Sequence, residues 1–422
     1  MDQEVSAAAP VDHMSPERVL LERFGHTGFR PGQREVIDSV LSGRDTLAIL
    51  PTGGGKSVTY QLPALVCGRC SLVISPLVAL MRDQVSQARR RGLRAASVDS
   101  TLDVDQRSRV LADVREGSLE LLYAAPEALA HLAADLGETR AFGMFAVDEA
   151  HCISQWGCDF RPDYRTLAQA RTVLAPTSPL LAVTATATAR VERDIAASLG
   201  MCDPFVFRGS FFRPNLRLCA IRKDGARDGR DAVAALTRAC EGGSAIVYRL
   251  SRAGANSLAG WLRRRGIAAH AYHAGLDAER RAFVQEEFLS GRCRVVVATV
   301  AFGMGVDKPD VRLVVHADLP GSLESYAQEV GRAGRDGLIS DCVLLYSWDD
   351  VRRRERLARD ADPDRRAHLR TAVREVYRFA AAGSCRQRAL CAHFGEAVTP
   401  PCGACDACGA VSASRLLTLG GW

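Results

Sequence analysis

Lysine is scarce in this chain of 422 residues: it occurs only at Lys56, Lys223 and Lys308, and every other basic side chain is arginine. The formal charge of +6 and the isoelectric point near 8.7 are compatible with a polyanionic partner. This excess is too small to indicate nucleic acid by itself. A lysine inside a glycine-rich loop, as at Lys56, therefore invites a functional interpretation.

The sequence also lacks long apolar runs. No segment approaches the roughly 18 apolar residues that a membrane span needs. Residues 1–4 do not begin a basic stretch followed by an apolar one, so they predict no secretory signal. We expect a cytoplasmic protein without membrane contact. In that reducing compartment the fourteen cysteines are expected to be buried thiols or metal ligands rather than disulfides.

The order of apolar segments predicts an α/β fold with two tandem parallel sheets. Apolar runs alternate with helix-length amphipathic segments, and the pattern restarts after residues 208–215. The runs are 46–50, 71–75, 119–123, 145–147 and 180–183, then 245–248, 295–298, 313–316 and 343–346. We predict a tail at 1–14, a first lobe at 15–208, a second lobe at 209–346, a helical module at 347–411 and a tail at 412–422.

A phosphate-binding loop is predicted between the first strand and the next helix. Its residues are Thr52, Gly53, Gly54, Gly55, Lys56 and Ser57. The glycines let backbone N–H groups close on phosphate oxygens, and the helix N-terminus adds a favourable dipole. Lys56 would reach the terminal phosphates of ATP, and the Ser57 hydroxyl would bind Mg²⁺. The strict pattern requires glycine at position 50, where this chain has Leu50.

Charged residues elsewhere supply the other groups that phosphoryl transfer needs. The predicted strand 145–147 ends in Asp148 and Glu149, and an acidic pair at the C-terminal end of a parallel strand can face a phosphate loop. Asp148 would then bind Mg²⁺ and Glu149 would orient the attacking water. In the second lobe, we predict that Arg335 brings a cation to the transferred phosphoryl group, with Arg332 assisting.

Together with residues 29–33, 75–77, 83–84, 184–186, 272–275 and 298–305, these motifs resemble superfamily-2 helicases and specifically the RecQ family of DNA helicases. The resemblance covers residues 24–408. It implies two RecA-like lobes, a small helical zinc-binding module, and an ATP-dependent 3′ to 5′ DNA helicase of recombination, replication and repair. It also implies that Arg30 and Gln33 read the adenine and that His26, where the family commonly has Tyr, stacks on it. The expected cofactors are ATP, Mg²⁺ and Zn²⁺.

Residues 152–162, directly after the acidic pair, match this family most specifically. Trp156, Phe160 and Arg161 offer two stacking faces and a guanidinium, a combination that holds single strands without reading their sequence. Because the loop is contiguous with the acidic pair, it can respond to both DNA and the γ-phosphate. Cys158 stands where the family usually has His. The resemblance also implies DNA backbone contacts from Ser75, His273 and Thr299.

Four cysteines near the end of the chain have metal-ligand spacing: Cys385, Cys402, Cys405 and Cys408. Four thiolates with two C-x₂-C steps suit tetrahedral Zn²⁺ in a structural site. An iron–sulfur cluster, which also takes four cysteines, is the alternative from the residues alone. The RecQ family has a zinc module at this place with this spacing. Cys391 falls outside the spacing and is interpreted as a buried thiol.

Three functional hypotheses remain open. The first is a monomeric, nucleoid-associated helicase on single-stranded, tailed or branched DNA, with single-strand-binding protein and other repair proteins as candidate partners. The second is an RNA-remodelling ATPase of the DEAH type, suggested by residues 148–151 but disfavoured by the aromatic loop. The third is a non-enzymatic DNA- or partner-binding module, or a DNA-binding ATPase without robust unwinding. It arises because RecQ proteins usually continue into a winged-helix domain and this chain ends about fourteen residues after Cys408.

Overall fold

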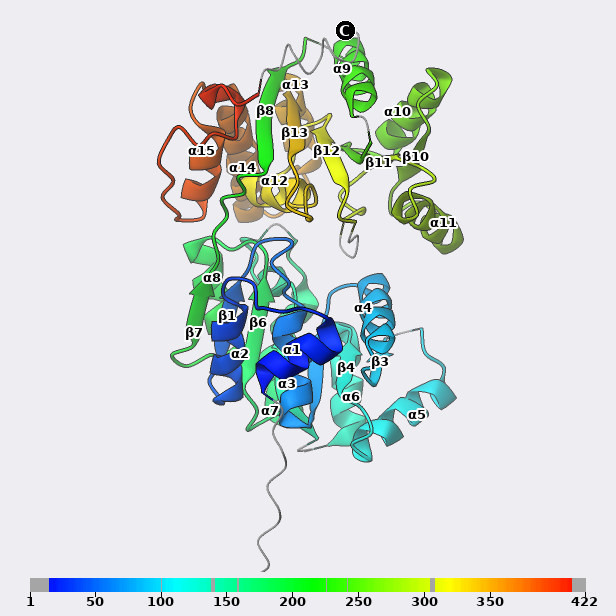
Figure 1. Ribbon diagram of the computed structural model, residues 1–422, viewed down its shortest axis with the longest axis vertical. Coiled ribbons are helices and arrows are strands. Elements are labelled where there is room, and N and C mark those ends of the chain that lie inside the picture. Colours follow the sequence, from blue (N-terminus) through cyan, green and yellow to red (C-terminus); the bar gives the residue numbers. More distant parts are fainter. Residues whose placement is uncertain are drawn as a thin grey trace, which may run out of the picture.

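The architecture consists of two parallel sheets, one above the other in Figure 1, with a helical module beside the second. This confirms the predicted fold of two RecA-like lobes followed by a small module. The predicted tails 1–14 and 412–422, and Cys158, lie outside the described residues. The computed structural model describes residues 15–99, 101–137, 141–157, 159–224, 226–240, 242–303 and 308–411.

The first lobe is a seven-stranded sheet in the order β3-β4-β2-β5-β6-β1-β7, and its described strand pairs are parallel. Its internal strands β1, β2 and β4 are buried along their whole length and mostly apolar, because helices cover both faces. The elements are α1 (Pro16–Phe24), α2 (Gln33–Leu41), β1 (Thr46–Ile49), α3 (Val58–Cys67), β2 (Cys70–Ile74), α4 (Val78–Arg90), β3 (Ala95–Val98), α5 (Val104–Arg115), β4 (Leu121–Ala124), η1 (Pro126–Ala128), α6 (Leu129–Leu136), β5 (Phe142–Val147), η2 (Ala150–Ile153), η3 (Pro162–Thr166), α7 (Leu167–Leu174), β6 (Leu180–Thr184), α8 (Ala189–Ser198) and β7 (Phe205–Arg208).

The second lobe is a six-stranded parallel sheet in the order β10-β11-β9-β12-β13-β8. A separate apolar cluster lies on each of its faces. The elements are β8 (Leu216–Arg222), α9 (Ala226–Ala239), β9 (Ser244–Tyr248), α10 (Arg252–Arg264), β10 (Ala269–Tyr272), α11 (Ala278–Leu289), β11 (Val295–Ala298), β12 (Val311–His316), α12 (Leu323–Val330) and β13 (Ser340–Tyr346).

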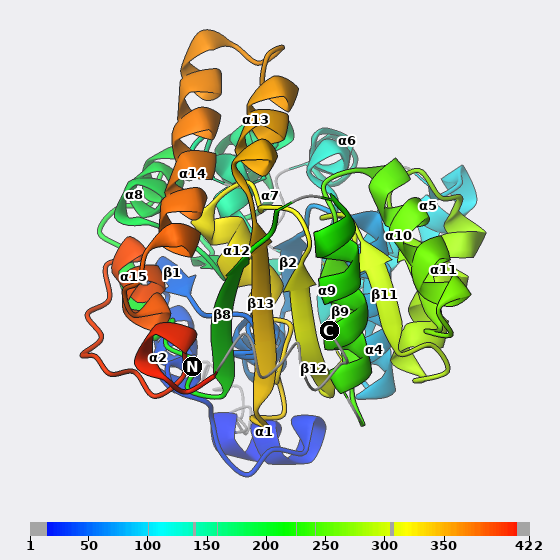
Figure 2. The same ribbon diagram turned by 90° about the horizontal axis from the view of Figure 1, so that it is seen from above.

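The module shares the core of the second lobe instead of forming its own. Phe379 and Leu390 of the module are buried in the same cluster as Leu216 and Leu218 of β8. In Figure 2, α13 and α14 lie side by side and extend past the strand ends. The elements are α13 (Trp348–Leu357), α14 (Pro363–Ala381), α15 (Arg386–His393) and η4 (Asp406–Cys408).

Strand order decides where the site forms. β6 lies between β5 and β1 in the first sheet, and in parallel sheets ligands bind beyond the carboxyl ends of the strands. The segment after β1, the acidic pair after β5 and Thr184 at the end of β6 therefore meet at one edge. The linker 209–215 then carries the chain from β7 into β8 of the second lobe.

Candidate nucleotide site, aromatic loop and metal centre

The predicted phosphate loop joins β1 to α3. Gly53 and Gly55 have left-handed backbone torsions, with φ of 85° and 77°, which favour glycine. A Cβ on Gly54 would lie 2.9 Å from the carbonyl oxygen of Pro51. All three positions therefore need glycine: Gly53 and Gly55 for their backbone torsions, and Gly54 for the close carbonyl oxygen. The loop has the tight backbone course that a phosphate cradle requires.

Gln33, at the start of α2 in the same lobe, forms hydrogen bonds with this loop. Its side-chain amide donates to the carbonyl oxygens of residues 54 and 55 at 3.3 and 2.9 Å, and its Oε1 accepts from the Arg30 N–H at 2.9 Å. The Arg30 guanidinium contacts the carbonyl oxygen of Gly53. His26 is exposed after the end of α1. Two of the three residues predicted for adenine thus also touch the phosphate loop.

Asp148 follows β5 and is 6% exposed. Burial and, secondarily, the charge of Glu149 raise the pKa of Asp148 to about 7, while Lys56 lowers it. Burial and, secondarily, the charge of Asp148 raise the pKa of Tyr60, while Ser57 lowers it, so this buried ring lies near both residues predicted to bind Mg²⁺. A carboxylate and a hydroxyl are the oxygen donors that Mg²⁺ takes, and the cation would offset the cost of burying the negative charge.

Glu149 has a left-handed backbone conformation, with φ 48° and ψ 45°. This conformation is unfavourable for a residue with a Cβ and persists where the surrounding structure enforces it, often at functional sites. Its Oε2 lies 3.4 Å from Nδ1 of His151, which lies 3.0 Å from the Thr184 hydroxyl. Because burial lowers the pKa of His151, the ring is neutral near pH 7. These contacts connect the acidic pair to the end of β6.

The second lobe closes on the phosphate loop through the end of α12. A Cβ on Gly331 would lie 2.8 Å from the Cβ of Thr52. Arg335 crosses the same loop, with its Cγ 3.7 Å from the position that a Cβ would take on Gly53. Arg332 is buried and contacts a carbonyl oxygen of its own lobe. The structure therefore brings Arg335 to the glycine loop and places Arg332 inside the second lobe.

Sequence reasoning missed Arg213, which lies in the linker between the lobes. Its guanidinium donates to the carbonyl oxygen of Thr52 at 3.1 Å and to that of Gly334 at 2.9 Å. One side chain thus joins the phosphate loop to the loop that carries Arg335. No local pattern marks this arginine, because its contacts join segments that are far apart in the chain.

The aromatic loop lies against the module rather than in open solvent. The guanidinium carbon of Arg190 is 3.5 Å from the centroid of the Trp156 ring, and the His368 ring of α14 packs edge-on at 5.4 Å. The guanidinium carbons of Arg165 and Arg365 lie 5.1 and 5.4 Å from the centroid of the Phe160 ring. A base that stacks on the covered face of Trp156 must first displace Arg190.

The other residues predicted to contact DNA follow strand ends. Arg161 donates to the carbonyl oxygen of Pro76 at 2.5 Å, so the aromatic loop touches the segment that Ser75 begins. Ser75 is buried after β2 and Thr299 is buried after β11. His273 follows β10 and is 4% exposed, and neither ring nitrogen has a hydrogen-bond partner among the described residues.

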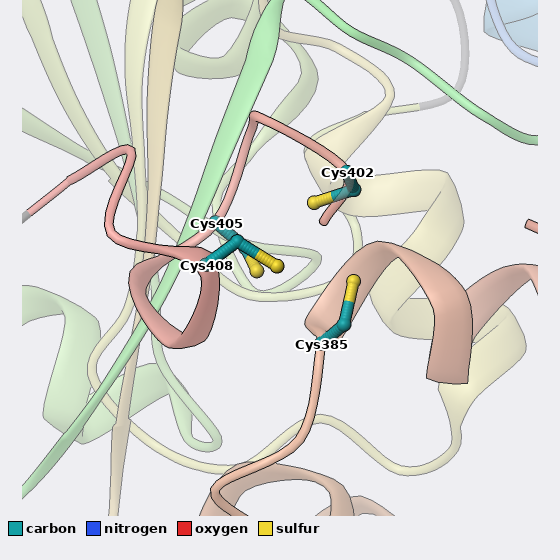
Figure 3. Close-up of side chains that lie close together, drawn as sticks. All are labelled: Cys385, Cys402, Cys405 and Cys408. Atoms are coloured by element: carbon teal, nitrogen blue, oxygen red, sulfur yellow. The ribbon is translucent and has the colours of Figure 1, made fainter. Parts of the chain in front are cut away.

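The four predicted metal ligands lie together and point toward one another (Figure 3). Their Sγ atoms all lie within 4.8 Å of one another, close enough for one tetrahedral ion to bind all four thiolates. Backbone N–H groups of Arg388 and Ala404 donate to Sγ of Cys385 and Cys402 at 3.5 and 3.4 Å, as outer-shell donors to metal-bound thiolates do. Cys391 lies outside this cluster and is fully buried, as predicted.

Three family models match consecutive parts of the chain: DEAD/DEAH box helicase at 30–195, helicase conserved C-terminal domain at 230–337 and RecQ zinc-binding at 348–409. The ATP-dependent DNA helicase RecQ of Pasteurella multocida is 41% identical over 397 residues, which cover 92% of this chain and 61% of that protein. The Haemophilus influenzae RecQ is 40% identical over 395 residues, covering 92% and 63%. The chain is thus similar to RecQ helicases along nearly its whole length.

The chain spans about three fifths of the length of these two RecQ proteins. A solved structure of Saccharomyces cerevisiae Dbp5 bound to RNA and ADP BeF₃ superimposes with a TM-score of 0.65 at 17% identity, covering 86% of this chain and 98% of Dbp5. At that identity the likeness shows the shared two-lobed fold alone. Among the described helices, none combines the length and apolar character needed to cross a membrane.

The RecQ zinc-binding match encloses all four clustered cysteines. It therefore favours zinc over the iron–sulfur alternative that the spacing had left open. The donor set agrees, since four thiolates without an open position suit a structural zinc site. In this chain, zinc would hold the turn at 402–408 against the start of α15.

Proposed function

We propose that this chain hydrolyses ATP when it is bound to single-stranded DNA, moves 3′ to 5′ along that strand and separates duplex DNA. The observation that carries the proposal is the convergence of three elements at one site between the lobes. Arg335 lies over the phosphate loop, the charge of Lys56 in that loop acts on Asp148 of the acidic pair, and the aromatic loop follows this pair. Similarity to RecQ DNA helicases supports DNA as the partner. The direction of movement rests on the family resemblance.

In this proposal each charged group has one task in hydrolysis. Lys56 and the backbone N–H groups of the loop hold the β- and γ-phosphates. Glu149 orients a water for in-line attack on the γ-phosphorus and accepts its proton as the bond to the ADP oxygen breaks. Arg335 stabilises the charge on the transferred phosphoryl group. Ser57 and Asp148 hold Mg²⁺, which neutralises phosphate charge when bound.

The remaining nucleotide contacts are proposed from position. His26 stacks on the adenine, and Arg30 and Gln33 read its edge. Because Gln33 already donates to the carbonyl oxygens of the phosphate loop, adenine recognition would act directly on the backbone that holds the phosphates. Arg332 assists from inside the second lobe by holding a neighbouring loop in place.

Single-stranded DNA would lie across the strand ends of both lobes. Trp156 and Phe160 supply stacking faces, which are worth about 1–3 kcal/mol per base, and Arg161 supplies a phosphate contact. Displacement of Arg190 from Trp156 would then couple DNA binding to the residues next to Glu149. Further backbone contacts are proposed for Ser75, His273 and Thr299.

A second candidate keeps hydrolysis and DNA binding but lacks robust unwinding. An RNA-dependent ATPase is the third candidate, and the stacking loop after the acidic pair disfavours it. For either DNA candidate we propose a monomer that works in the cytoplasm, near the nucleoid, with single-strand-binding and repair proteins as partners.

The test is an ATPase titration with single-stranded DNA and with RNA, run beside an unwinding assay on duplexes with 3′ and 5′ tails. Lys56→Ala is the control, because it should weaken nucleotide binding and turnover together. We expect stimulation by DNA and unwinding of the 3′-tailed duplex. Stimulation without unwinding selects the second candidate. Stimulation by RNA but not DNA reverses the choice of partner.

A further inference from the structure

Arg213 joins two parts of the site that the sequence separates widely. Its NH1 donates to the carbonyl oxygen of Thr52 at 3.1 Å, and its NH2 donates to those of Ala333 and Gly334 at 3.3 and 2.9 Å. Thr52 precedes the loop glycines, and Gly334 precedes Arg335. The guanidinium therefore spans the gap between the lobes with three hydrogen bonds. Its planar, rigid fork suits this bridging better than a single ammonium group would.

The module fixes the linker that carries Arg213 through hydrogen bonds and a stacked pair of rings. Gln387 of α15 donates to the carbonyl oxygens of Arg213 and Leu216 at 3.0 and 3.1 Å. The Phe211 ring stacks on Phe394 with centroids 4.0 Å apart and planes 6° from parallel. These contacts fix the backbone at the point from which the Arg213 side chain extends.

A carboxylate completes this attachment. Glu396 accepts from the backbone N–H of Phe211 at 2.6 Å and from the Ser210 hydroxyl at 2.5 Å. The linker is therefore bonded to the module at residues 210, 211 and 213 and to the phosphate loop through Arg213. A displacement of the module would be transmitted to the nucleotide site through one arginine.

We propose that Arg213 is a positioning residue for ATP hydrolysis: it sets Arg335 over the phosphate loop without touching ATP, and the module sets Arg213. This rests on the proposed function, in which Arg335 is the finger. An arginine finger can stabilise the transferred phosphoryl group only if the loop that carries it is fixed in position. A misplacement of about 1 Å can lower the rate by on the order of 10². Arg213 supplies that restraint by bonding the residue before Arg335 and the residue before Gly53 at the same time.

The test compares Arg213→Ala, Arg335→Ala and the double substitution for kcat and for the Kd of ATP under non-hydrolysing conditions. Arg213→Ala should lower kcat by about 10- to 100-fold and change the Kd by less than about threefold. The double variant should match Arg335→Ala alone, because a residue that acts through Arg335 adds nothing once Arg335 is absent. Arg213→Lys, which keeps the charge but not the fork, should recover only part of the loss.

Arg217→Ala is the matched control. Arg217 is the next arginine in the chain and pairs with Asp341 at 2.7 Å within the second lobe, so its loss should leave kcat unchanged. Unchanged kcat in Arg213→Ala, or losses that multiply in the double variant, would overturn the positioning role. An equally lowered melting temperature and kcat in Arg213→Ala and Arg213→Lys would also overturn it. Full activity of Arg335→Ala would instead refute the finger assignment in the proposed function.

Discussion

Replacing Cys405 with serine should destabilise the module and the edge of the second sheet together. Cys405 is fully buried. The residues on either side of it bond to β8: the Leu218 N–H donates to the Ala404 carbonyl at 3.0 Å, and the Ala220 N–H donates to the Asp406 carboxylate at 2.9 Å. A serine hydroxyl does not replace a soft thiolate as a zinc ligand. The turn would therefore lose both its metal and its alignment with the strand.

The size of the effect can be worked from these contacts. Structural zinc in small domains contributes about 10–16 kcal/mol, so one ligand of four carries about 3–4 kcal/mol. The two hydrogen bonds to β8 contribute about 1 kcal/mol each. A loss of about 5–6 kcal/mol is comparable with the whole stability of an ordinary domain, about 5–15 kcal/mol. Poor solubility and a low melting temperature are expected.

The assay combines elemental analysis, absorption spectroscopy and thermal unfolding. The unaltered chain should hold about one zinc and show no visible absorption. Cys391→Ser is the matched control: this thiol is equally buried but lies outside the cluster, so the variant should keep its metal and lose only about 1 kcal/mol from burying a hydroxyl. A brown, iron-containing protein would replace zinc with a cluster. A Cys405→Ser variant with full metal content and an unchanged melting temperature would show that Cys405 is not a zinc ligand that stabilises the module.

Three further predictions concern other parts of the chain. Glu149→Gln should bind ATP almost normally but lower kcat by on the order of 10² or more, because only the water-orienting group is removed; full turnover would contradict that role. Trp156→Ala should keep basal hydrolysis and lose its stimulation in a DNA titration, whereas equal losses of both rates would indicate a structural residue. Burial lowers the pKa of His393, but the hydrogen bond and charge of Glu324 outweigh burial, so the pKa of His393 is raised. Burial raises the pKa of Glu324, but His393 outweighs burial, so the pKa of Glu324 is lowered. This pair should therefore stabilise most between about pH 4.5 and 6.5 and progressively less as pH rises through the raised His393 pKa. Melting curves of His393→Gln should show a deficit that shrinks toward alkaline pH, and a constant deficit would exclude the linkage.

The strands that the sequence pattern revealed and those that it missed differ in one physical respect. The nine predicted runs became the internal strands of the two sheets, and the four unpredicted strands, β3, β7, β8 and β10, are the sheet edges. An internal strand is covered on both faces and both sides, so it is almost purely apolar. Edge strands are partly exposed and keep polar residues, as at Arg217 in β8 and His270 in β10. Hydrophobic periodicity detects the first kind and not the second.

Sequence patterns alone predicted the phosphate loop, the acidic pair, the aromatic loop and the cysteine cluster, because each is a short contiguous or closely spaced pattern that one chemistry requires. Tertiary structure alone decided which residues meet across the lobes. The bridge made by Arg213, the cover that Arg190 forms over Trp156 and the attachment of the linker by Gln387 join residues that are distant in the chain. None has a local signature, since a hydrogen bond or a stacked ring depends on where folding brings two groups and not on their neighbours in sequence.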